Sequence, residues 1–299
     1  MTVPVRMSDP GVIHDYPFSP RRHQLPDGNS LSYLDEGEGP VVVMLHGNPT
    51  WSYFYRKLVR LLKGGYRVIV PDHLGCGLSD KPQDWTYQLS NHIDNLEDLL
   101  HALGISRCSL VVHDWGGAIG MGYAVRHPSV VNAFVIFNTA AFHSHRIPAR
   151  IRLCRVPLLG PLLVRGLNGF AGPALRMAVT KRMDSATDRA YLLPYDSWKN
   201  RIATLRFVQD IPLSSMDPSW QTLGEIEAGL HLFRDTPMLI CWGGKDFCFN
   251  DHFYHEWQRR FPQARCHYFQ DAGHYVLEDA YERIAPLVAA FFAETSSPC

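Results

Sequence analysis

The stretch Ser109–Ala118, with the sequence SLVVHDWGGA, decides the fold of this chain. Its apolar run is typical of a strand in a parallel sheet, which is buried on both faces. The paired glycines allow a sharp turn and close packing against a following helix. A strand, one reactive residue, glycines and a helix form a nucleophile elbow, in which a tight turn exposes the reactive side chain above the sheet edge. The residue at that turn is Asp114.

An aspartate at the turn predicts a particular chemistry. The carboxyl group of a free aspartate has a pKa of about 3.9, so Asp114 is expected to be ionised at neutral pH without the help of a base. A carboxylate nucleophile forms an ester with its substrate, and a positioned base is needed only for a later step. Asp is also a preferred N-cap residue, so a purely structural role at the start of the helix is the alternative interpretation.

Composition limits the class of protein. The chain has 299 residues, 46% of them hydrophobic, with 29 Lys and Arg against 29 Asp and Glu. This balance argues against nucleic acid as a partner, because phosphate binding needs a basic excess. The sequence has no CxxC pair, no metal-ligand cluster and no GxGxxG motif after a strand, so we expect neither a metal nor another cofactor. An apolar signal peptide and a membrane-spanning run are also absent from the sequence, which favours a cytoplasmic protein.

Strand-like and helix-like segments alternate along most of the chain, which predicts an α/β fold with a mostly parallel, doubly wound sheet. Buried strands are predicted at residues 41–45, 66–70, 110–112, 130–137, 238–242 and 265–269. Between the fourth and fifth of these strands, the apolar residues have helical spacing instead. We therefore predict a core made of residues 1–139 and 226–299, and a helical cap, residues 140–225, inserted over the C-terminal edge of the sheet.

One segment of the predicted cap is strongly apolar. Residues Val156–Val164 read VPLLGPLLV and are flanked by Arg155 and Arg165. A core helix of the cap is the simplest interpretation. Apolar residues beside cations are also typical of a segment that contacts a membrane or a partner, and they could equally form the wall of a wide apolar pocket. Periodicity alone does not separate these alternatives.

Three ionisable residues form a candidate catalytic triad. Asp114, Asp246 and His274 each come just after a predicted strand, in the chain order nucleophile, acid and histidine that α/β-hydrolase triads have. The ends of parallel strands meet at one sheet edge, so residues far apart in sequence can converge there. We expect His274 to accept a proton or activate water, and Asp246 to fix its tautomer. Taken singly, each could instead be an ordinary turn or surface residue.

Asn48 and Trp115 are the candidate donors to an anion. Asn48 lies in HGNP, directly after the first predicted buried strand, and Trp115 follows Asp114. These are the positions whose backbone N–H groups form an oxyanion hole. Their side chains add a carboxamide and an indole N–H, neutral donors suited to holding an anionic leaving group. The structural alternative is that Asn48 serves the turn before Pro49 and Trp115 only packs.

Five segments resemble the haloalkane dehalogenases, a group of α/β-hydrolases with helical caps. They are HGNPTWSY (46–53), PDHLGCGLSDKP (71–82), VVHDWGGAIG (111–120), GGKDFCF (243–249) and DAGHYVLEDA (271–280). The resemblance covers nearly the whole chain. It implies that Asp114 is the alkylated nucleophile, that His274 is the base, and that Asn48 and Trp115 together hold the halide.

One residue departs from the best-known dehalogenases. Those with this Asn–Trp pair place a glutamate where this chain has Asn138, so the acid shifts to Asp246, as in the third dehalogenase subfamily. That subfamily resembles the cis-β-lactone decarboxylases of bacterial long-chain olefin synthesis, and the segments GGKDFCFNDHF (243–253) and FVQDIPLSSMDPSW (207–220) strengthen the likeness. The resemblance implies an apolar cis-β-lactone with two long alkyl chains as substrate, a cis-alkene and carbon dioxide as products, and assembly with other enzymes of that pathway.

Three other functions remain open at this point. A true haloalkane dehalogenase would use the same triad to hydrolyse carbon–halogen bonds. An epoxide hydrolase would need two cap tyrosines to protonate the epoxide, and Tyr191 and Tyr195 are the candidates, although Asn48 argues against this class. A ligand-binding or scaffold α/β-hydrolase with weak catalysis is the non-enzymatic alternative, against which the intact triad argues.

Overall fold

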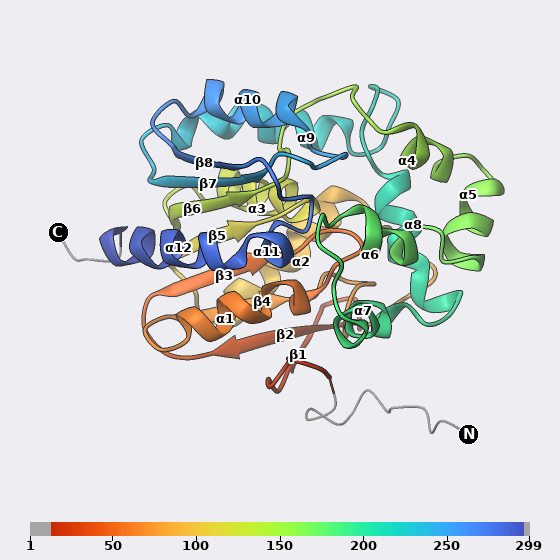
Figure 1. Ribbon diagram of the computed structural model, residues 1–299, viewed down its shortest axis with the longest axis horizontal. Coiled ribbons are helices and arrows are strands. Elements are labelled where there is room, and N and C mark those ends of the chain that lie inside the picture. Colours follow the sequence, from red (N-terminus) through yellow and green to blue (C-terminus); the bar gives the residue numbers. More distant parts are fainter. Residues whose placement is uncertain (1–12, 296–299) are drawn as a thin grey trace.

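The computed structural model describes residues 13–295, and its centre is an eight-stranded sheet (Figure 1). The strand order is β1-β2-β4-β3-β5-β6-β7-β8; β1 and β2 pair antiparallel, β2 pairs antiparallel with β4, and the other pairs are parallel. The strands are β1 (Arg21–Gln24), β2 (Ser30–Glu36), β3 (Val41–Leu45), β4 (Arg67–Pro71), β5 (Cys108–Val112), β6 (Val131–Phe137), β7 (Met238–Gly243) and β8 (Arg265–Phe269). The prediction of a mostly parallel α/β sheet is confirmed.

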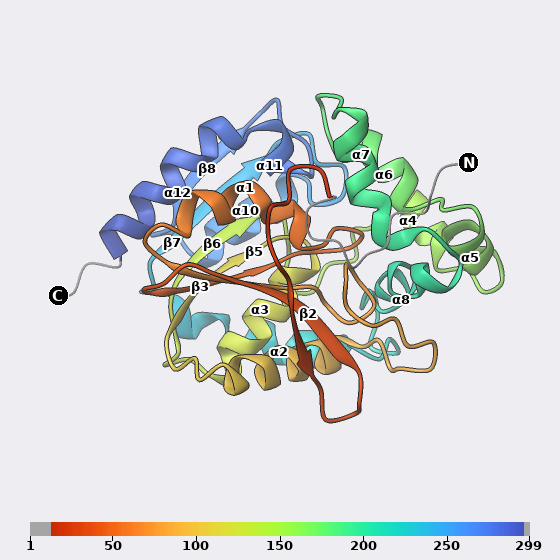
Figure 2. The same cartoon turned by 90° about the horizontal axis from the view of Figure 1, so that it is seen from below.

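The sheet separates two hydrophobic clusters, which explains the unbroken apolar runs of its strands. Successive side chains of a strand point to opposite faces. In β5, Leu110 and Val112 therefore enter one cluster, and Val111 enters the other. In Figure 2 helices α1 and α12 lie on one side of the sheet, and α2 and α3 on the other. The core helices are α1 (Arg56–Leu62), α2 (Leu89–Ala102), α3 (Trp115–Arg126), α9 (Trp220–Gly229), α10 (Asp251–Arg260), α11 (Val276–Asp279) and α12 (Tyr281–Thr295).

The part of the chain between β6 and α9 builds a helical layer at one end of the sheet, on the right in Figure 1. Its α-helices are α4 (Ala149–Cys154), α5 (Leu159–Pro161), α6 (Ala171–Met177), α7 (Ser185–Leu192) and α8 (Ile202–Gln209). The predicted end of the cap at residue 225 falls inside α9, which packs against α3 of the core. None of the helices within residues 13–295 is long and apolar enough to cross a membrane.

The apolar segment Val156–Val164 is not a core helix, so that prediction is wrong. Two prolines and a glycine interrupt it, and it forms only the three-residue α5 followed by a single turn of π-helix, Leu162–Gly166. Val164 is buried, but Leu158 is 88% exposed and most of the other apolar side chains of the segment are exposed as well. None of its residues lines the main cavity of the cap. The segment therefore faces outward.

Candidate active site

The turn after β5 holds Asp114 in a strained conformation. Asp114 has φ 52° and ψ −127°, a backbone region that residues with a side chain rarely adopt. The next residues must be small, because a Cβ atom on Gly116 would lie 2.0 Å from the carbonyl oxygen of Leu45, and one on Gly117 would collide with Thr139. Close packing against β3 thus forces the sharp turn that the elbow motif predicts, and α3 starts at Trp115.

The structure brings Asp114, His274 and Asp246 together at the C-terminal edge of the sheet. All three side chains are buried. His274 Nδ1 lies 2.7 Å from Asp246 Oδ2, and His274 Nε2 lies 3.7 Å from Asp114 Oδ2. The other oxygen of Asp246 accepts hydrogen bonds from the backbone N–H groups of Cys248 (2.6 Å) and Phe249 (3.1 Å). Asp246 is therefore fixed by its own loop and in turn orients the imidazole.

The two carboxylate oxygens of Asp114 have different environments. Oδ1 accepts a hydrogen bond of 2.7 Å from the backbone N–H of Asn48, and the backbone N–H of Trp115 also lowers the pKa of the carboxyl group. At least one of the two backbone donors predicted from the sequence, the N–H of Asn48, is thus engaged by the Asp114 carboxylate. Oδ2 faces His274 instead.

Burial and neighbouring charges shift the pKa values of this pair. Burial is the largest effect on Asp114 and raises its pKa above the ordinary 3.8, against the opposing effects of His274 and the Asn48 and Trp115 N–H groups. Burial alone would lower the pKa of His274, but the carboxylates of Asp246 and Asp114 outweigh it, and the pKa of His274 rises above 6.5. The two carboxylates therefore stabilise the protonated form of His274 relative to a free imidazole.

The side chains of Asn48 and Trp115 both line the cavity above the nucleophile. Asn48 Nδ2 donates one hydrogen bond of 3.1 Å to the backbone carbonyl of Thr204 in α8, which leaves its second N–H available. The indole of Trp115 packs against Phe207, with ring centroids 5.1 Å apart. The cap therefore positions both donors, which sequence reasoning could not foresee because neither Thr204 nor Phe207 carries a motif.

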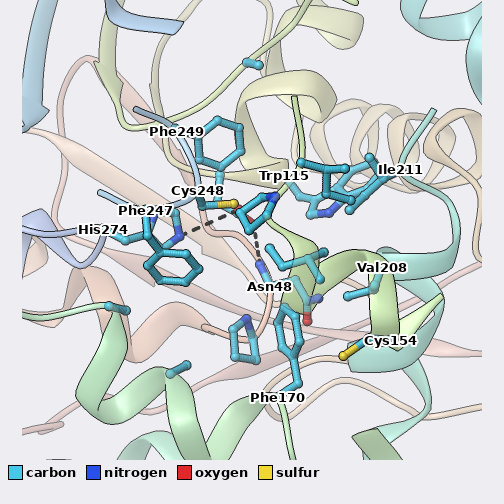
Figure 3. Close-up of a pocket in the computed structure, with 18 of the residues that line it drawn as sticks. Asn48, Trp115, Cys154, Phe170, Val208, Ile211, Phe247, Cys248, Phe249 and His274 are labelled. Carbon is cyan, nitrogen blue, oxygen red and sulfur yellow. Dashed lines mark hydrogen bonds and ion pairs between the residues drawn. The ribbon is translucent and has the colours of Figure 1, made fainter. Parts of the chain in front are cut away.

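The cavity has a volume of about 500 Å³ and mostly apolar walls (Figure 3). The cap supplies one side of it through Cys154, Phe170, Val208 and Ile211, among other residues. The core supplies the other side, including the segment Phe247–Phe249 directly after Asp246. The sequence motif contained these three residues, but only the structure shows that they are part of the wall. The cavity suits a large apolar substrate with its reactive atoms near Asp114.

Asn138 takes no part in the triad. Its side chain exchanges two hydrogen bonds with the backbone of Gly243, of 3.0 and 2.8 Å, and so ties β6 to β7 beside the loop that carries Asp246. The cap tyrosines are also engaged elsewhere: Tyr191 donates to Glu278 and Tyr195 donates to the carbonyl of Thr50. Neither tyrosine lines the cavity. This arrangement argues against an epoxide hydrolase.

Comparison with known protein families agrees with the geometry of the site. A family model described as "alpha/beta hydrolase fold" matches residues 40–281. The chain belongs to the α/β-hydrolase family. Within residues 13–295, this α/β-hydrolase has no group of three His, Cys, Asp or Glu side chains that could hold a metal ion.

Two curated relatives of this α/β-hydrolase are nearly half identical to it. Both are named cis-3-alkyl-4-alkyloxetan-2-one decarboxylase. The protein from Shewanella oneidensis is 48% identical over 93% of this chain and 90% of its own, and the one from Xanthomonas campestris pv. campestris is 47% identical over 92% and 96%. Haloalkane dehalogenase 2 of Mycobacterium tuberculosis is 30% identical over 93% of this chain and 96% of its own.

Solved structures of dehalogenases share the fold of this α/β-hydrolase. The haloalkane dehalogenase DbeA from Bradyrhizobium elkanii superposes with a TM-score of 0.84 at 26% identity, covering 93% of this chain and 98% of the other. A putative ancestral haloalkane dehalogenase has a TM-score of 0.83 at 27% identity, over 93% and 100% of the two chains. The decarboxylases are thus much closer in sequence than these dehalogenases are.

Proposed function

We propose that this chain is a cis-3-alkyl-4-alkyloxetan-2-one decarboxylase, which converts long-chain cis-β-lactones to cis-alkenes and carbon dioxide. Relatives with that name are 47–48% identical over more than nine tenths of the chain. One observation supports this chemistry above the others. The carboxylate of Asp114 is buried at the floor of a large apolar cavity and is paired with His274. Such a cavity has room for alkyl chains, and a carboxylate can attack an electrophilic carbon without a base.

In the first step, Asp114 Oδ2 attacks the ring carbon that bears the lactone oxygen. A bond forms between Oδ2 and that carbon, the ring carbon–oxygen bond breaks, and the electron pair leaves with the oxygen as part of a new carboxylate. The carbon is inverted, and an alkyl ester of Asp114 results. The free N–H of Asn48 and the indole N–H of Trp115 then hold the released carboxylate, in the place where a dehalogenase would hold halide.

The hydrogen bonding of Asp114 favours attack on this carbon over attack on the lactone carbonyl. Carbonyl attack gives a mixed anhydride through an oxyanion, which needs preorganised donors. Of the two backbone N–H groups at the usual place, that of Asn48 already binds the carboxylate of Asp114. Trapping the covalent adduct separates the routes, because an alkyl ester at Asp114 excludes the anhydride.

In the second step, the carboxylate is lost as carbon dioxide. Its carbon–carbon bond breaks, the electron pair forms the alkene, and the bond to Asp114 breaks, so that the nucleophile is regenerated. Anti elimination after one inversion converts a cis-lactone to a cis-alkene. No water is consumed. A protonated His274, favoured by Asp246, stabilises Asp114 as it departs.

Haloalkane dehalogenation is the second candidate, since a relative of that name is 30% identical and the same triad would serve it. The deciding experiment incubates the pure protein with a long-chain cis-β-lactone and, separately, with a 1-haloalkane, and measures alkene and halide. Alkene from the lactone, with little halide, is expected. Asp114→Asn is expected to abolish alkene formation while thermal unfolding stays unchanged. Halide without alkene would replace the decarboxylase assignment with the dehalogenase one, and alkene formation by the variant would exclude Asp114 as nucleophile.

We also propose a cytoplasmic location and assembly with other enzymes of olefin synthesis. The six described cysteines are all free thiols, which suits a reducing compartment. Assembly stays a prediction from the resemblance. Cell fractionation and co-purification from a native host test the two proposals separately.

A further inference from the structure

The exposed large apolar side chains of this protein are concentrated on one part of the cap. Six of the eleven within the described residues fall between positions 153 and 167, and they form what we call the cap patch: Leu153, Val156, Leu158, Leu159, Leu162 and Leu167. Helix α5, in the middle of this stretch, lies at the outer end of the cap in both ribbon views (Figures 1 and 2). Scattered exposed leucines are ordinary, but a cluster of them usually marks a contact surface.

Leu158, at the tip of the cap patch, has an unfavourable backbone conformation. Its φ is 65° and its ψ is −47°, and the N–H of Leu159 donates to the carbonyl of Pro157 at 2.7 Å. This is the rare, strained form of γ-turn, which glycine adopts at less cost. A leucine at this position destabilises the folded protein, and because it is 88% exposed its side chain gains no packing within the chain in return. Its apolar side chain therefore fits a role outside the protein.

The chain around the cap patch is strongly basic. Residues 140–183 contain eight Lys and Arg and no Asp or Glu, although the whole chain has equal numbers. These cations are Arg146, Arg150, Arg152, Arg155, Arg165, Arg176, Lys181 and Arg182. Arg152 is exposed, and no carboxylate within residues 13–295 forms an ion pair with it or with Arg146. Arg155 is paired with Asp217 and Arg176 with Asp188, whereas Arg152 and Arg165 have no carboxylate partner within the described residues. Apolar side chains beside such unpaired cations are complementary to an anionic lipid surface.

Helix α4 connects the cap patch to the cavity. Ile151 and Cys154 line the cavity from its inner face, while Arg152 and Leu153 are exposed on the outside. The diameter of a helix, roughly 10 Å, therefore separates the outer surface from the reaction chamber. If the proposed function holds, the substrate and the alkene product are both lipid-like, so a lipid phase at this face would shorten their path.

We propose that the cap patch binds the surface of an anionic lipid bilayer. The leucines of the patch enter the interface, and the unpaired arginines beside them, Arg152 above all, stay at the level of the lipid phosphates. Each exposed leucine that enters the interface and each arginine close to the phosphates adds to the affinity for the bilayer. Binding therefore needs both kinds of residue and weakens with salt.

The experiment is sedimentation of the full-length protein with vesicles of phosphatidylcholine, alone or mixed with phosphatidylglycerol. Binding to the mixed vesicles, and much weaker binding to the neutral ones, is expected. The double variant Leu158→Gly, Leu162→Ser should bind about tenfold or more weakly, as two leucines are lost. Arg152→Gln should bind about fivefold more weakly. Leu232→Ser, which alters a half-exposed leucine outside the cap, is the matched control and should bind as the wild type does.

The proposal is overturned if the mixed vesicles bind no protein, or if the double variant binds them as well as the control does. A wild-type oligomer that dissociates in the double variant, without vesicle binding, would make this face a contact between copies of the chain. Leu158→Gly relieves a strained turn, so a loss of binding with an unchanged thermal midpoint excludes misfolding. Turnover of a soluble short-chain lactone by the same variants tests the proposed function separately, because the patch lies outside the cavity.

Discussion

Asp114 presents one oxygen to the backbone N–H of Asn48 and the other to His274, and the position of the histidine makes its role testable. In a dehalogenase His274 must activate water, whereas the proposed decarboxylation consumes none. His274→Gln should therefore slow alkene formation by about 10²-fold or more, yet leave it catalytic. With a 1-haloalkane, the same variant should release one halide per protein and then stop as an ester. Rapid-quench assays with mass spectrometry of the intact protein check both results.

The pH profile gives a second test at the scale of single residues. Burial raises the pKa of Asp114, so activity should fall in acid at a pH above the ordinary 3.8. In the proposed mechanism a protonated His274 stabilises the departing carboxylate, so alkene formation should also fall as the pH rises through the raised pKa of His274. Water activation needs neutral His274, so halide release would rise over that same interval.

The variant Asp246→Asn extends the pH test, because it removes the nearest carboxylate that raises the pKa of His274. The basic limb for alkene formation should move to lower pH in this variant. A limb that stays in place would show that His274 does not set it. The kcat/KM profiles of wild type and variant, measured on one lactone, supply the comparison.

The residues of the triad could be predicted from the sequence, whereas their supporting contacts could not. Asp114, Asp246 and His274 each follow a strand, and the chain order of such residues is a strong signal. The bond from Asn48 to the Thr204 carbonyl joins residues 156 positions apart and involves a backbone atom. Such a contact leaves no mark on local composition, so only the folded cap reveals it.

At the scale of elements, a buried ion network joins the cap to the core. Arg56 of α1 is only 2% exposed, and its Nη2 lies 3.1 Å from Glu278 of α11. Tyr191 of α7 donates to the same carboxylate at 2.6 Å. Burial alone would raise the pKa of Glu278, but Arg56 outweighs it and holds the pKa below 4.5. A lowered pKa means that this stabilisation is complete above pH 4.5 and is lost as the pH falls through the folded-state value.

Glu278→Gln should accordingly destabilise the protein by about 3 kcal/mol near neutral pH, because it leaves Arg56 buried without its main counter-charge. The difference from the wild type should shrink below pH 4.5, where Glu278 itself becomes protonated. Urea unfolding at the two pH values measures both effects. Asp188→Asn, which breaks a pair with the exposed Arg176 on the cap, is the control and should change stability little at either pH.

Sequence patterns predicted the strands better than the cap. The strands of the sheet are short apolar runs bounded by turn residues, and their burial on both faces requires that composition. The segment Val156–Val164 has the same composition for a different reason. Its prolines prevent a regular helix, and its leucines face outward. An apolar composition indicates that a segment is shielded from water, but it does not show whether the protein's own core or another phase shields it.

At the scale of the whole molecule, the cap and the core together enclose the cavity. Ala174 of α6 lines the cavity from the cap side. Ala174→Phe should fill part of the space for an alkyl chain, and so lower kcat/KM for long-chain lactones by about tenfold or more, while short-chain lactones are turned over as before. Ala174→Ser, which keeps the volume, is the control. An equal loss on both substrates would place Ala174 outside the binding site for the chain.

The separation of charge between the cap and the rest of the chain affects how the molecule is oriented as it approaches a charged surface. Residues 140–225 contain twelve Lys and Arg and six Asp and Glu, so the remainder of this neutral chain carries the opposite excess. Such a molecule has an electric dipole although its net charge is zero. Near a negative plane, within the screening distance of about 8 Å at physiological ionic strength, the dipole experiences a torque that turns the cap forward. The molecule would then be oriented before it touches the surface, and a larger fraction of collisions would bring the cap into contact with it.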